Sequence, residues 1–468
     1  MTICERHSGG RILCIRLSGL GDVVHALNAL SLLRRERPDA HIAWLVEDRF
    51  RGLLRGHPCI DELIGVPRGA WTAMAKNPLR WWELGSELRQ FGLRLRRAKF
   101  DISVDFQSSL KSAWLVLAAG AELRVGFDRG VNREFNLLSQ NRLVRAPRTG
   151  VHRIERDLAL LAPLGIPTRY ADPVLPVSRA DSEAMDRALA GRLTGGPMVV
   201  VHPGTSKSAA FKRWDPGRYA RVADRLVAER NADVVLSYGP QEKELAEQVL
   251  GLMRRRGLLA PPTENLQQLT RLLSRADLFI GSDTGPMHIA SALQVPVVAL
   301  FGPKDPVQTG PYCGRSIVVT APVDCRPCTK RRCSHVRCMR NITPTRVAQA
   351  ALDLLDGGGR CPAADGLIRK PMTVGFRLGR WQGQIATCYS RPEFYARLCE
   401  PDAIISASDA KVIRAGQSRC SASVPASVEG PVDRFFVKRY YPKRGLYYKL
   451  GDLLMKPRAR NSWDCARR

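Results

Sequence analysis

Apolar and polar residues follow two alternating patterns from about residue 10 onward. Short apolar runs predict strands at residues 11–17, 41–46, 60–66 and 100–105, and the residues between them repeat apolar positions at helical spacing. Strands separated by helices are typical of a parallel sheet with helices on both faces. The first part of the chain is therefore expected to be an α/β layer structure.

The same pattern begins again in the second part of the chain. Strands are predicted at residues 198–201, 233–237, 277–280 and 295–300, and helices at residues 216–229, 266–274 and 286–293. The two parts have similar size and join near residues 171–196. They predict a two-domain α/β protein, residues 1–178 and 179–356, with a cleft between the domains.

The pattern changes after residue 356. Residues 357–370 begin with three consecutive glycines and are interpreted as a linker. Residues 371–468 contain short strand-like pieces, at residues 384–389 and 434–440, and end in a basic tail. We expect this last part to form a partial α+β appendage rather than an independent domain.

Composition narrows the class of protein. The chain carries 73 Lys and Arg against 44 Asp and Glu, a net charge of +29, and its apolar content of 44% excludes general disorder. It shows no apolar run long enough to span a membrane and no N-terminal secretion signal. Thirteen cysteines, an odd number, fit a reducing cytosol, and the positive charge indicates an anionic partner.

Asp22 is the first candidate catalytic residue. It ends the segment Ser-Gly-Leu-Gly-Asp, residues 18–22, where a predicted strand turns into a helix whose free N–H groups favour an anion. A dinucleotide-binding loop would need a third glycine where Val24 stands, so a dehydrogenase is disfavoured. Two interpretations of Asp22 stay open: a favourable charge in the first helical turn, or a general base facing the cleft.

A second loop, residues 281–288, has the sequence Gly-Ser-Asp-Thr-Gly-Pro-Met-His and also precedes a predicted helix. Its Asp or Thr either caps the helix or joins the helix N–H groups in a phosphate cradle. Residues 202–206 end another strand of the same half, and Lys212 can supply positive charge for a diphosphate. Several phosphate-type loops at the carboxyl ends of one sheet favour the cradle.

Three motifs, residues 18–25, 212–214 and 282–288, resemble those of the ADP-heptose:lipopolysaccharide heptosyltransferases, glycosyltransferase family 9, and keep their order. The resemblance extends over roughly residues 10–355. It implies a GT-B fold, in which two Rossmann-like domains face each other across a cleft, the first binding the acceptor and the second the ADP-sugar. It also implies an inverting transfer with no obligatory metal and no other cofactor.

The resemblance further implies roles for individual residues. Asp22 matches the catalytic base of the family. The donor side is matched by Thr205, Ser206, Lys212, Glu242, Asp283, Thr284, Gly285 and His288, with Glu244 as a rival of Glu242. The acceptor side is matched by Lys111, Arg129 and Arg133, as ligands of Kdo carboxylates or phosphates. Any one of these three cations also fits a solvated surface position.

Four cysteines form a dense cluster, Cys325, Cys328, Cys333 and Cys338, with His335 inside it. Their spacing is compatible with a zinc knuckle. Similar cysteines occur in relatives of the second heptosyltransferase without a reliable metal role, so free or structural thiols are the favoured interpretation. The cluster follows the second sheet, away from the expected cleft, and is assigned no catalytic role.

Residues 73–100 combine apolar and basic positions. Six apolar residues are spaced to share one helical face, with seven Lys and Arg around them: Trp81, Trp82, Leu84, Leu88, Phe91 and Leu95. The helix either packs on the first sheet, the favoured interpretation, or lies at an anionic bilayer surface. Docking there would place a cytoplasmic protein at the inner face of the inner membrane and bring a lipid-anchored acceptor to the cleft.

The tail at residues 435–443 resembles the small lobe of lipopolysaccharide-core Kdo and heptose kinases, with Lys438 as the lysine that contacts ATP phosphates. The chain contains no His-Arg-Asp or Asp-Phe-Gly sequence, and 30 residues follow Lys438. Residues 371–468 are therefore expected to be a truncated kinase-like lobe that cannot transfer phosphate.

Together these features predict an inverting glycosyltransferase that moves heptose from ADP-heptose to the Kdo/heptose inner core of lipopolysaccharide. A non-catalytic scaffold for core assembly is the alternative. A nucleic-acid partner is not expected, because no familiar nucleic-acid-binding module occurs in the sequence. The acceptor stays open between Kdo and a first heptose, since the acceptor-side residues resemble the first heptosyltransferase and the cysteine cluster resembles the second.

Overall fold

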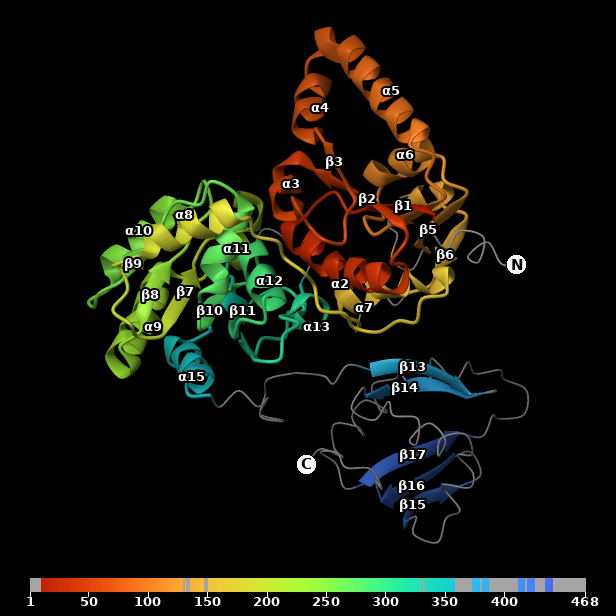
Figure 1. Ribbon diagram of the computed structural model, residues 1–468. Helices are drawn as coiled ribbons and strands as arrows, with labels where there is room; N and C mark the ends of the chain where they lie inside the picture. The colour runs from red at the N-terminus through yellow and green to blue at the C-terminus, as the bar shows by residue number, and fades with distance from the viewer. Residues whose placement is uncertain are drawn as a thin grey trace. The chain divides into compact units, whose positions relative to one another are not determined.

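The structure is a computed structural model that describes residues 10–128, 131, 135–146, 150–328, 330 and 333–357, together with five strand segments farther along the chain. The chain divides into two units, Met1–Ile368 and Arg369–Arg468. Both sheets predicted from the sequence belong to the first unit (Figure 1).

The first sheet has six parallel strands in the order β3-β2-β1-β4-β5-β6. They are β1 (Arg11–Ile15), β2 (His41–Glu47), β3 (Glu62–Val66), β4 (Ile102–Asp105), β5 (Leu123–Phe127) and β6 (Arg142–Val144). The helices of this half are α2 (Leu20–Glu36), α3 (Asp48–Leu54), α4 (Arg68–Ala75), α5 (Trp81–Arg97), α6 (Leu110–Ala119) and α7 (Arg153–Ala159). Short 3-10 turns are η1 (Pro78–Arg80), η2 (Phe135–Ser139) and η3 (Ala162–Leu164).

Helices cover this sheet on both faces, as the apolar character of its central strands predicts. Alternate residues of β1 point to opposite faces, so Ile12 and Cys14 enter the core formed with α2 and α7. Leu13 and Ile15 enter the other core, which is formed with α4, α5 and α6. The start of α2 is thereby fixed against the carboxyl end of β1.

The second sheet also has six parallel strands, in the order β12-β11-β10-β7-β8-β9. They are β7 (Met198–His202), β8 (Asp233–Leu236), β9 (Leu258–Leu259), β10 (Leu278–Ser282), β11 (Val297–Phe301) and β12 (Ser316–Thr320). The helices of this half are α8 (Arg179–Leu189), η4 (Lys207–Lys212), α9 (Pro216–Arg230), α10 (Lys243–Leu252), α11 (Leu266–Ser274), α12 (Gly285–Ala292), α13 (Pro306–Thr309), α14 (Arg337–Arg340) and α15 (Pro344–Leu355).

The two sheets have the same topology, because the order of the second, taken from its opposite edge, repeats the order of the first. The direction of winding reverses between β1 and β4 in one sheet and between β7 and β10 in the other. In open α/β sheets, ligands bind outside the carboxyl ends of the strands at such reversals. The loops that follow these four strands are therefore the positions where a ligand is expected.

Most predicted elements lie within a few residues of their predicted positions, with two differences that bear on function. Gly281 and Ser282 were expected in a loop but are the last residues of β10, so the loop begins at Asp283. Residues 73–100 were expected to form one helix, but Pro78 starts the separate turn η1 between α4 and α5. The prediction also missed β5, β6, β9 and β12.

In the second unit, the described residues form two antiparallel sheets. β13 (Thr373–Leu378) pairs with β14 (Trp381–Ala386), and β16 (Arg419–Pro425) pairs with both β15 (Lys411–Gly416) and β17 (Arg434–Tyr440). The strand predicted at residues 434–440 is confirmed, and Lys438 lies in it. The likeness to a truncated kinase lobe stays a prediction.

No helix among the described residues combines the length and the apolar character needed to cross a membrane. The expected linker, residues 357–370, lies outside the described residues except for its first glycine.

Candidate functional site

The amino ends of α2 and α12 meet where the two halves of the first unit are in contact. Leu20 begins α2 directly after β1, and Gly285 begins α12 directly after β10. A Cβ on Gly285 would lie 2.5 Å from the Leu20 side chain, and a Cβ on Gly21 would overlap the imidazole of His288. Glycine is needed at both positions because the two helix ends approach closely, so the loops after β1 and β10 form one site.

Asp22 lies at this junction, in the first turn of α2, and contacts the two cations Arg16 and Arg153. One carboxylate oxygen is 3.2 Å from Nη2 of Arg16 and accepts a hydrogen bond from Nη1 of Arg153. Burial raises the pKa of Asp22, but Arg16 and Arg153 outweigh burial and hold the pKa below its ordinary value. The carboxylate is therefore ionised.

The carboxyl end of β4 supports the Asp22 loop from behind. Gln107 accepts hydrogen bonds from the backbone N–H groups of Leu17 and Ser18, at 3.0 and 3.1 Å, and Arg16 donates to the carbonyl of Phe106. The fully buried carboxylate of Asp105 accepts hydrogen bonds from Gln107 N–H and from further side chains, which fixes this strand end. The turn before α2 is thus held in one geometry.

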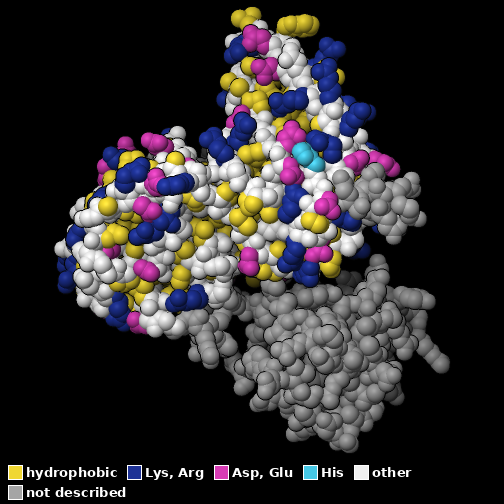
Figure 2. Space-filling model, viewed as in Figure 1, with side chains coloured by type: hydrophobic (Ala, Val, Ile, Leu, Met, Phe, Trp, Pro, Cys, Tyr) yellow, Lys and Arg dark blue, Asp and Glu magenta, His cyan; other side chains and the backbone are white. Residues whose placement is uncertain are grey.

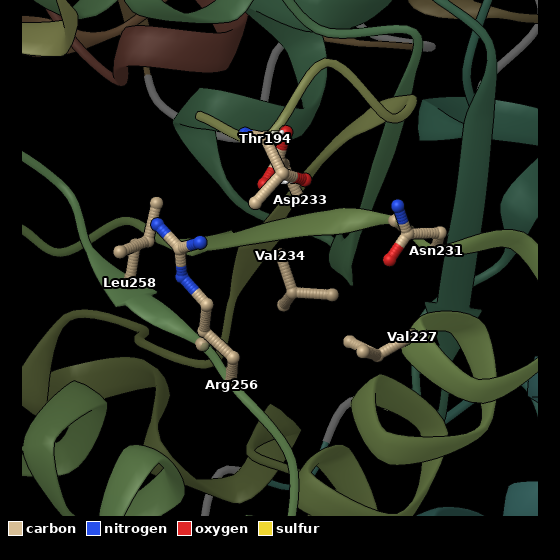
Figure 3. A pocket seen from close by; sticks show the side chains of 9 residues that line it. Thr194, Val227, Asn231, Asp233, Val234, Arg256 and Leu258 are labelled. Carbon is tan, nitrogen blue, oxygen red and sulfur yellow. Dashed lines mark hydrogen bonds between the residues drawn. The ribbon is translucent and has the colours of Figure 1, made fainter. Parts of the chain in front are cut away.

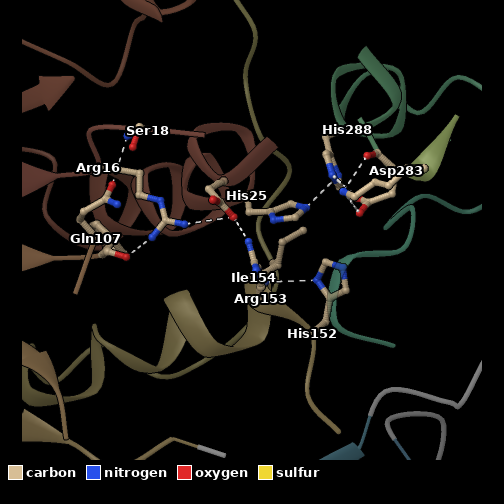
Figure 4. Close-up of polar contacts among 12 residues, drawn as sticks. Arg16, Ser18, His25, Gln107, His152, Arg153, Ile154, Asp283 and His288 are labelled. Carbon is tan, nitrogen blue, oxygen red and sulfur yellow. Dashed lines mark hydrogen bonds and ion pairs between the residues drawn. The ribbon is translucent and has the colours of Figure 1, made fainter. Parts of the chain in front are cut away.

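On the other half, a chain of polar contacts begins at Lys212 and ends at α2. The Lys212 ammonium is 2.6 Å from Oδ2 of Asp283, and Oδ1 of Asp283 is 3.3 Å from Nε2 of His288. Nδ1 of His288 lies 3.0 Å from Nε2 of His25 (Figure 4). Burial raises the pKa of Asp283, but His288 and Lys212 outweigh it and lower that pKa strongly. A residue of the first half is thereby joined to the predicted donor loop.

These partners restrict the orientation of both histidines. Nε2 of His288 faces the Asp283 carboxylate, and Nδ1 of His288 shares a hydrogen bond with Nε2 of His25. Nδ1 of His25 is buried without a hydrogen-bond partner among the described residues. Burial and the nearby His288, His152 and arginines hold the pKa of His25 well below its ordinary value, which keeps this ring neutral.

Glu242, rather than its rival Glu244, faces the carboxyl ends of the strands. Its Oε2 lies 3.3 Å from Nε2 of His202, the last residue of β7, and accepts the backbone N–H of Gly239 at 3.0 Å. Burial raises the pKa of Glu242, while the contact with His202 lowers it, and the net shift is downward. Glu244 is exposed on α10.

The remaining donor-side residues occupy different environments. Thr205 is buried and its hydroxyl accepts a hydrogen bond from Arg213 at 3.0 Å, whereas Ser206 is exposed. Thr284 precedes α12, and its side chain makes no capping hydrogen bond to the helix. The cap interpretation of this loop is therefore wrong for Thr284, and the N–H groups of the first turn of α12 have no side-chain cap.

The acceptor-side assignment stays a prediction. Lys111 is exposed in the first turn of α6, and Arg129 and Arg133 lie outside the described residues.

The residues that sequence reasoning missed are Arg16 and Arg153. Arg16 had a signal, since it is a cation inside an apolar strand pattern, but Arg153 is 131 positions from Asp22 and had none.

The cysteine cluster does not assemble a metal centre among the described residues, where no group of three or more metal-ligating side chains converges. Cys333 lies 3.6 Å from Nδ1 of His335, Cys325 is exposed, and Cys338 is buried against Met339 of α14. The four cysteines are free thiols in this structure. The zinc-knuckle alternative gains no support from this arrangement.

A shallow pocket occurs at the opposite, amino ends of the second sheet (Figure 3). Asp233 is among its lining residues, but that carboxylate accepts hydrogen bonds from the backbone N–H groups of Thr194 and Gly195 and from the Thr194 hydroxyl. These bonds hold the loop before β7 in place. The pocket therefore has a structural carboxylate and none of the groups predicted from the motifs.

The chain is similar in sequence to proteins of known class. The family model for glycosyltransferase family 9 (heptosyltransferase) matches residues 88–338. Lipopolysaccharide heptosyltransferase 1 of Pseudomonas aeruginosa is 31% identical over 326 residues, which are 69% of this chain and 88% of that protein. Lipopolysaccharide core heptosyltransferase OpsX of Haemophilus influenzae is 29% identical over 311 residues, which are 66% of this chain and 84% of that protein.

Solved structures share the fold. The structure of Escherichia coli ADP-heptose lps heptosyltransferase II superposes with a TM-score of 0.59 at 25% identity and covers 74% of this chain and 99% of that chain. The glycosyl transferase family 9 structure from Veillonella parvula DSM 2008 superposes with a TM-score of 0.62 at 23% identity, over 74% of this chain and 97% of that chain. The expected GT-B fold with two Rossmann-like sheets is confirmed.

Proposed function

Because the chain belongs to glycosyltransferase family 9, the heptosyltransferases, we propose that it transfers heptose from ADP-heptose to the inner core of lipopolysaccharide, with Asp22 as the general base. The enzyme class and the core-assembly reaction are those of its relatives. The observation that carries the role of Asp22 is its position at the meeting point of α2 and α12, beside the loop of Asp283 and His288. We assign acceptor binding to residues 1–178 and donor binding to residues 179–356.

The second half is suited to hold the nucleotide end of the donor. The amino end of α12 offers N–H groups without a side-chain cap, and Lys212 brings an ammonium to the same loop through Asp283. Both favour the negative charge of a diphosphate. Glu242 and His202 lie at the neighbouring strand ends, where Glu242 can accept hydrogen bonds from ribose hydroxyls.

The transfer needs a base on the acceptor side and charge stabilisation on the leaving-group side. The acceptor hydroxyl oxygen attacks the anomeric carbon as the bond from that carbon to the diphosphate oxygen breaks, and the electron pair of the broken bond leaves with ADP. The hydroxyl proton passes to the Asp22 carboxylate. Attack opposite the leaving group inverts the anomeric centre, and Lys212 with the α12 amides stabilises the charge that develops on ADP.

The base is tested with Asp22→Asn. We expect kcat to fall by roughly 10²- to 10⁴-fold, the usual contribution of a general base, while calorimetry gives an unchanged ADP affinity. Asp48→Asn is the matched control, because Asp48 also begins a helix after a strand of the first sheet and is exposed. Product formed from ADP-heptose and a Kdo-lipid acceptor is measured by mass spectrometry.

The outcomes of this experiment separate the alternatives. Undiminished transfer by Asp22→Asn would remove Asp22 from the base role and leave the enzyme class intact. No ADP binding by the wild-type protein, combined with binding of lipopolysaccharide, would favour the non-catalytic scaffold instead. The mass of the product with Kdo or heptosylated acceptors identifies the acceptor sugar.

We infer that the enzyme is cytoplasmic and docks on the anionic inner membrane through the arm formed by α4, η1 and α5. The arm ends in apolar side chains that are largely exposed: Leu79 by 91%, Trp81 by 61% and Trp82 by 88%. Figure 2 shows apolar side chains at this end and basic side chains along the arm. Residues 68–97 carry seven Lys and Arg against two Glu, a balance that favours an anionic bilayer surface.

The interpretation favoured from the sequence, a helix packed on the first sheet, applies to only part of this arm. Phe91 and Leu95 are buried against the first sheet, as that interpretation requires. The amino end of α5 extends beyond the sheet, so Trp81 and Trp82 do not share that burial. Indole rings are favoured at the membrane–water interface, where an apolar body and a polar N–H both find partners.

Membrane docking is tested by replacing both indoles, Trp81→Ser with Trp82→Ser. We expect sedimentation with phosphatidylglycerol vesicles to fall by about tenfold or more, whereas transfer to a soluble acceptor is unchanged. Leu252→Ser is the control, because Leu252 is an exposed apolar side chain on the other half. Equal vesicle binding by the double variant and the control would exclude the arm as the docking surface.

A further inference from the structure

The two cations that bind Asp22 differ in how firmly each is held. Arg16 comes from the strand end of β1, its side chain is 6% exposed, and it also donates to the Phe106 carbonyl. Arg153 comes from the first turn of α7, and its side chain is 35% exposed. Arg16 is thus a fixed part of the core, whereas Arg153 is within reach of a ligand.

Arg153 also has unused hydrogen-bonding capacity. Its Nη1 donates to Asp22, and its Nε is buried without a partner among the described residues. A guanidinium has five N–H donors in a planar fork that matches a carboxylate or a phosphate with two parallel hydrogen bonds. A second anion that reaches the exposed part of this guanidinium can therefore compete with the single Asp22 oxygen.

The double pairing of Asp22 is unfavourable for a base. Two adjacent guanidinium groups stabilise its charged form, so the pKa of Asp22 is lowered despite burial. A general base works best when its pKa lies near the operating pH, because proton affinity is then large enough to assist the transfer. Removing one cation before the reaction would raise the proton affinity of Asp22 where it is needed.

We propose that an anionic group of the acceptor, a carboxylate or a phosphate, takes the Arg153 guanidinium from Asp22 on binding and thereby frees Asp22 to act as the base. The inference rests on the proposed function and adds a positioning residue to it. Acceptor binding and activation of the base become one event. Without an acceptor, Asp22 stays paired and is a poor proton acceptor towards water.

The other charged and titratable groups near Asp22 do not duplicate Arg153. His288, which approaches from α12, uses Nε2 for Asp283 and Nδ1 for His25. Asp157, on α7, is a buried carboxyl whose pKa is raised to about 6 by burial, against the lowering effect of Arg16 and Arg156. Arg156, also on α7, is partly exposed too and senses the Asp22 charge, but its guanidinium lies over the Phe127 ring. Arg153 is the partly exposed cation that hydrogen-bonds Asp22 among the described residues.

The experiment compares the pH profiles of kcat/KM for the acceptor and of kcat, which report the free enzyme and the complex respectively. In the wild type, the rise of kcat with pH is expected at least half a pH unit above that of kcat/KM, because Asp22 loses Arg153 in the complex. Arg153→Ala should bring the two rises together at the higher pH and raise the acceptor KM about tenfold. Arg169→Ala removes an Arg–Glu pair elsewhere in the same half. It should retain the wild-type difference in pH between the rise of kcat and the rise of kcat/KM, which we call the split.

Arg153→Lys keeps the charge without the planar fork, so it should preserve a reduced split and guards against a folding defect in the alanine variant. Acceptors with a methyl-esterified Kdo carboxylate or without phosphate identify the anion, because removal of the correct group abolishes the split in the wild type. A split that persists in Arg153→Ala, or that survives both acceptor changes, overturns the inference. Absence of any wild-type product would overturn the proposed function instead.

Discussion

Asp22 and Asp283 occupy corresponding positions in the two halves of the molecule. Each follows a strand beside the reversal of its sheet and lies at the amino end of a helix. Asp283 is paired with Lys212 in a site where both side chains are at least four-fifths buried, and its second oxygen meets His288. Asp22 is paired with an arginine that remains open to solvent.

This difference in burial of the partner cation distinguishes Asp283, a carboxylate that holds the site together, from Asp22, the carboxylate proposed to react. A buried ion pair with a further hydrogen bond has one stable arrangement, so Asp283 fixes Lys212 and His288 in place. An ion pair with an accessible partner can be exchanged for another at little cost. The first half can therefore respond to a ligand where the second half is already organised.

The largest expected effect that tests this contrast is on stability. Asp283→Asn leaves Lys212 buried beside a neutral amide, and breaking a buried pair in this way costs about 3–5 kcal/mol of unfolding free energy. Asp22→Asn should cost less than Asp283→Asn, because one of its two cations, Arg153, reaches solvent and the other, the buried Arg16, keeps its hydrogen bond to the Phe106 carbonyl. Urea unfolding followed by circular dichroism measures both, and equal losses would abolish the distinction.

Gly21→Ala tests the junction between the two carboxylate sites. The added methyl group overlaps the His288 ring, so the helix ends must separate, and overpacking of this kind costs about 2 kcal/mol. Transfer should fall with it, since the base and the donor loop move apart. Gly52→Ala is the control, because a Cβ on Gly52 of α3 meets no atom within 4 Å. Unchanged stability and activity in Gly21→Ala would contradict the close approach seen here.

His152, at the start of the helix that carries Arg153, makes the junction sensitive to acid. Burial, helped by the nearby His288, Arg153 and Arg156, lowers the pKa of His152 to about 3, although the hydrogen bond from its Nε2 to the Gly310 carbonyl acts in the opposite direction. Its Nδ1 accepts the N–H of Ile154. An unfolded histidine binds a proton near pH 6.5, so the folded state loses stability as pH falls below that value, by about 2 kcal/mol between pH 7 and pH 5.

His152→Asn tests this acid sensitivity, because asparagine can cap the helix without titrating in this range. Its unfolding free energy should fall less than that of the wild type between pH 7 and pH 5, as measured by urea unfolding at each pH. A slope equal to that of the wild type would show that His152 does not contribute to the loss.

The smallest expected effect concerns the nucleoside end. Glu242→Gln removes a charge that accepts hydrogen bonds at the strand ends, and we expect ADP affinity to fall about tenfold by calorimetry. Glu244→Gln, two residues away on an exposed helical face, should leave the affinity unchanged. An equal loss in both variants would indicate a general charge effect rather than a contact by Glu242.

Much of this architecture could be predicted from the sequence, because its strands are short apolar runs buried on both faces. β1, β7 and β10 were found for that reason, and the motifs placed Asp22 and Asp283 at strand ends. β6 was missed because two of its three residues are exposed, and β9 because it has only two residues. Edge strands of this kind lack the pattern on which the prediction depends.

The site residues that the sequence did not predict are held by contacts between residues far apart in the sequence. Arg153 reaches Asp22 because α7 packs beside α2, and no local pattern records that packing. The spacing of Trp81, Leu84 and Phe91 indicates a helical face but not how far the sheet extends beneath it. Periodicity gives the orientation of a side chain, and tertiary structure decides whether anything covers it.

The close approach of α2 and α12 has an electrostatic consequence. The amino end of each helix carries partial positive charge, so two like ends of helix dipoles approach each other where Gly21 faces His288 and Gly285 faces Leu20. A nucleotide diphosphate bound there would act as their shared counter-ion. Donor occupancy should therefore tighten the contact between the halves before any acceptor arrives, and rising ionic strength should weaken this coupling because added salt screens the repulsion.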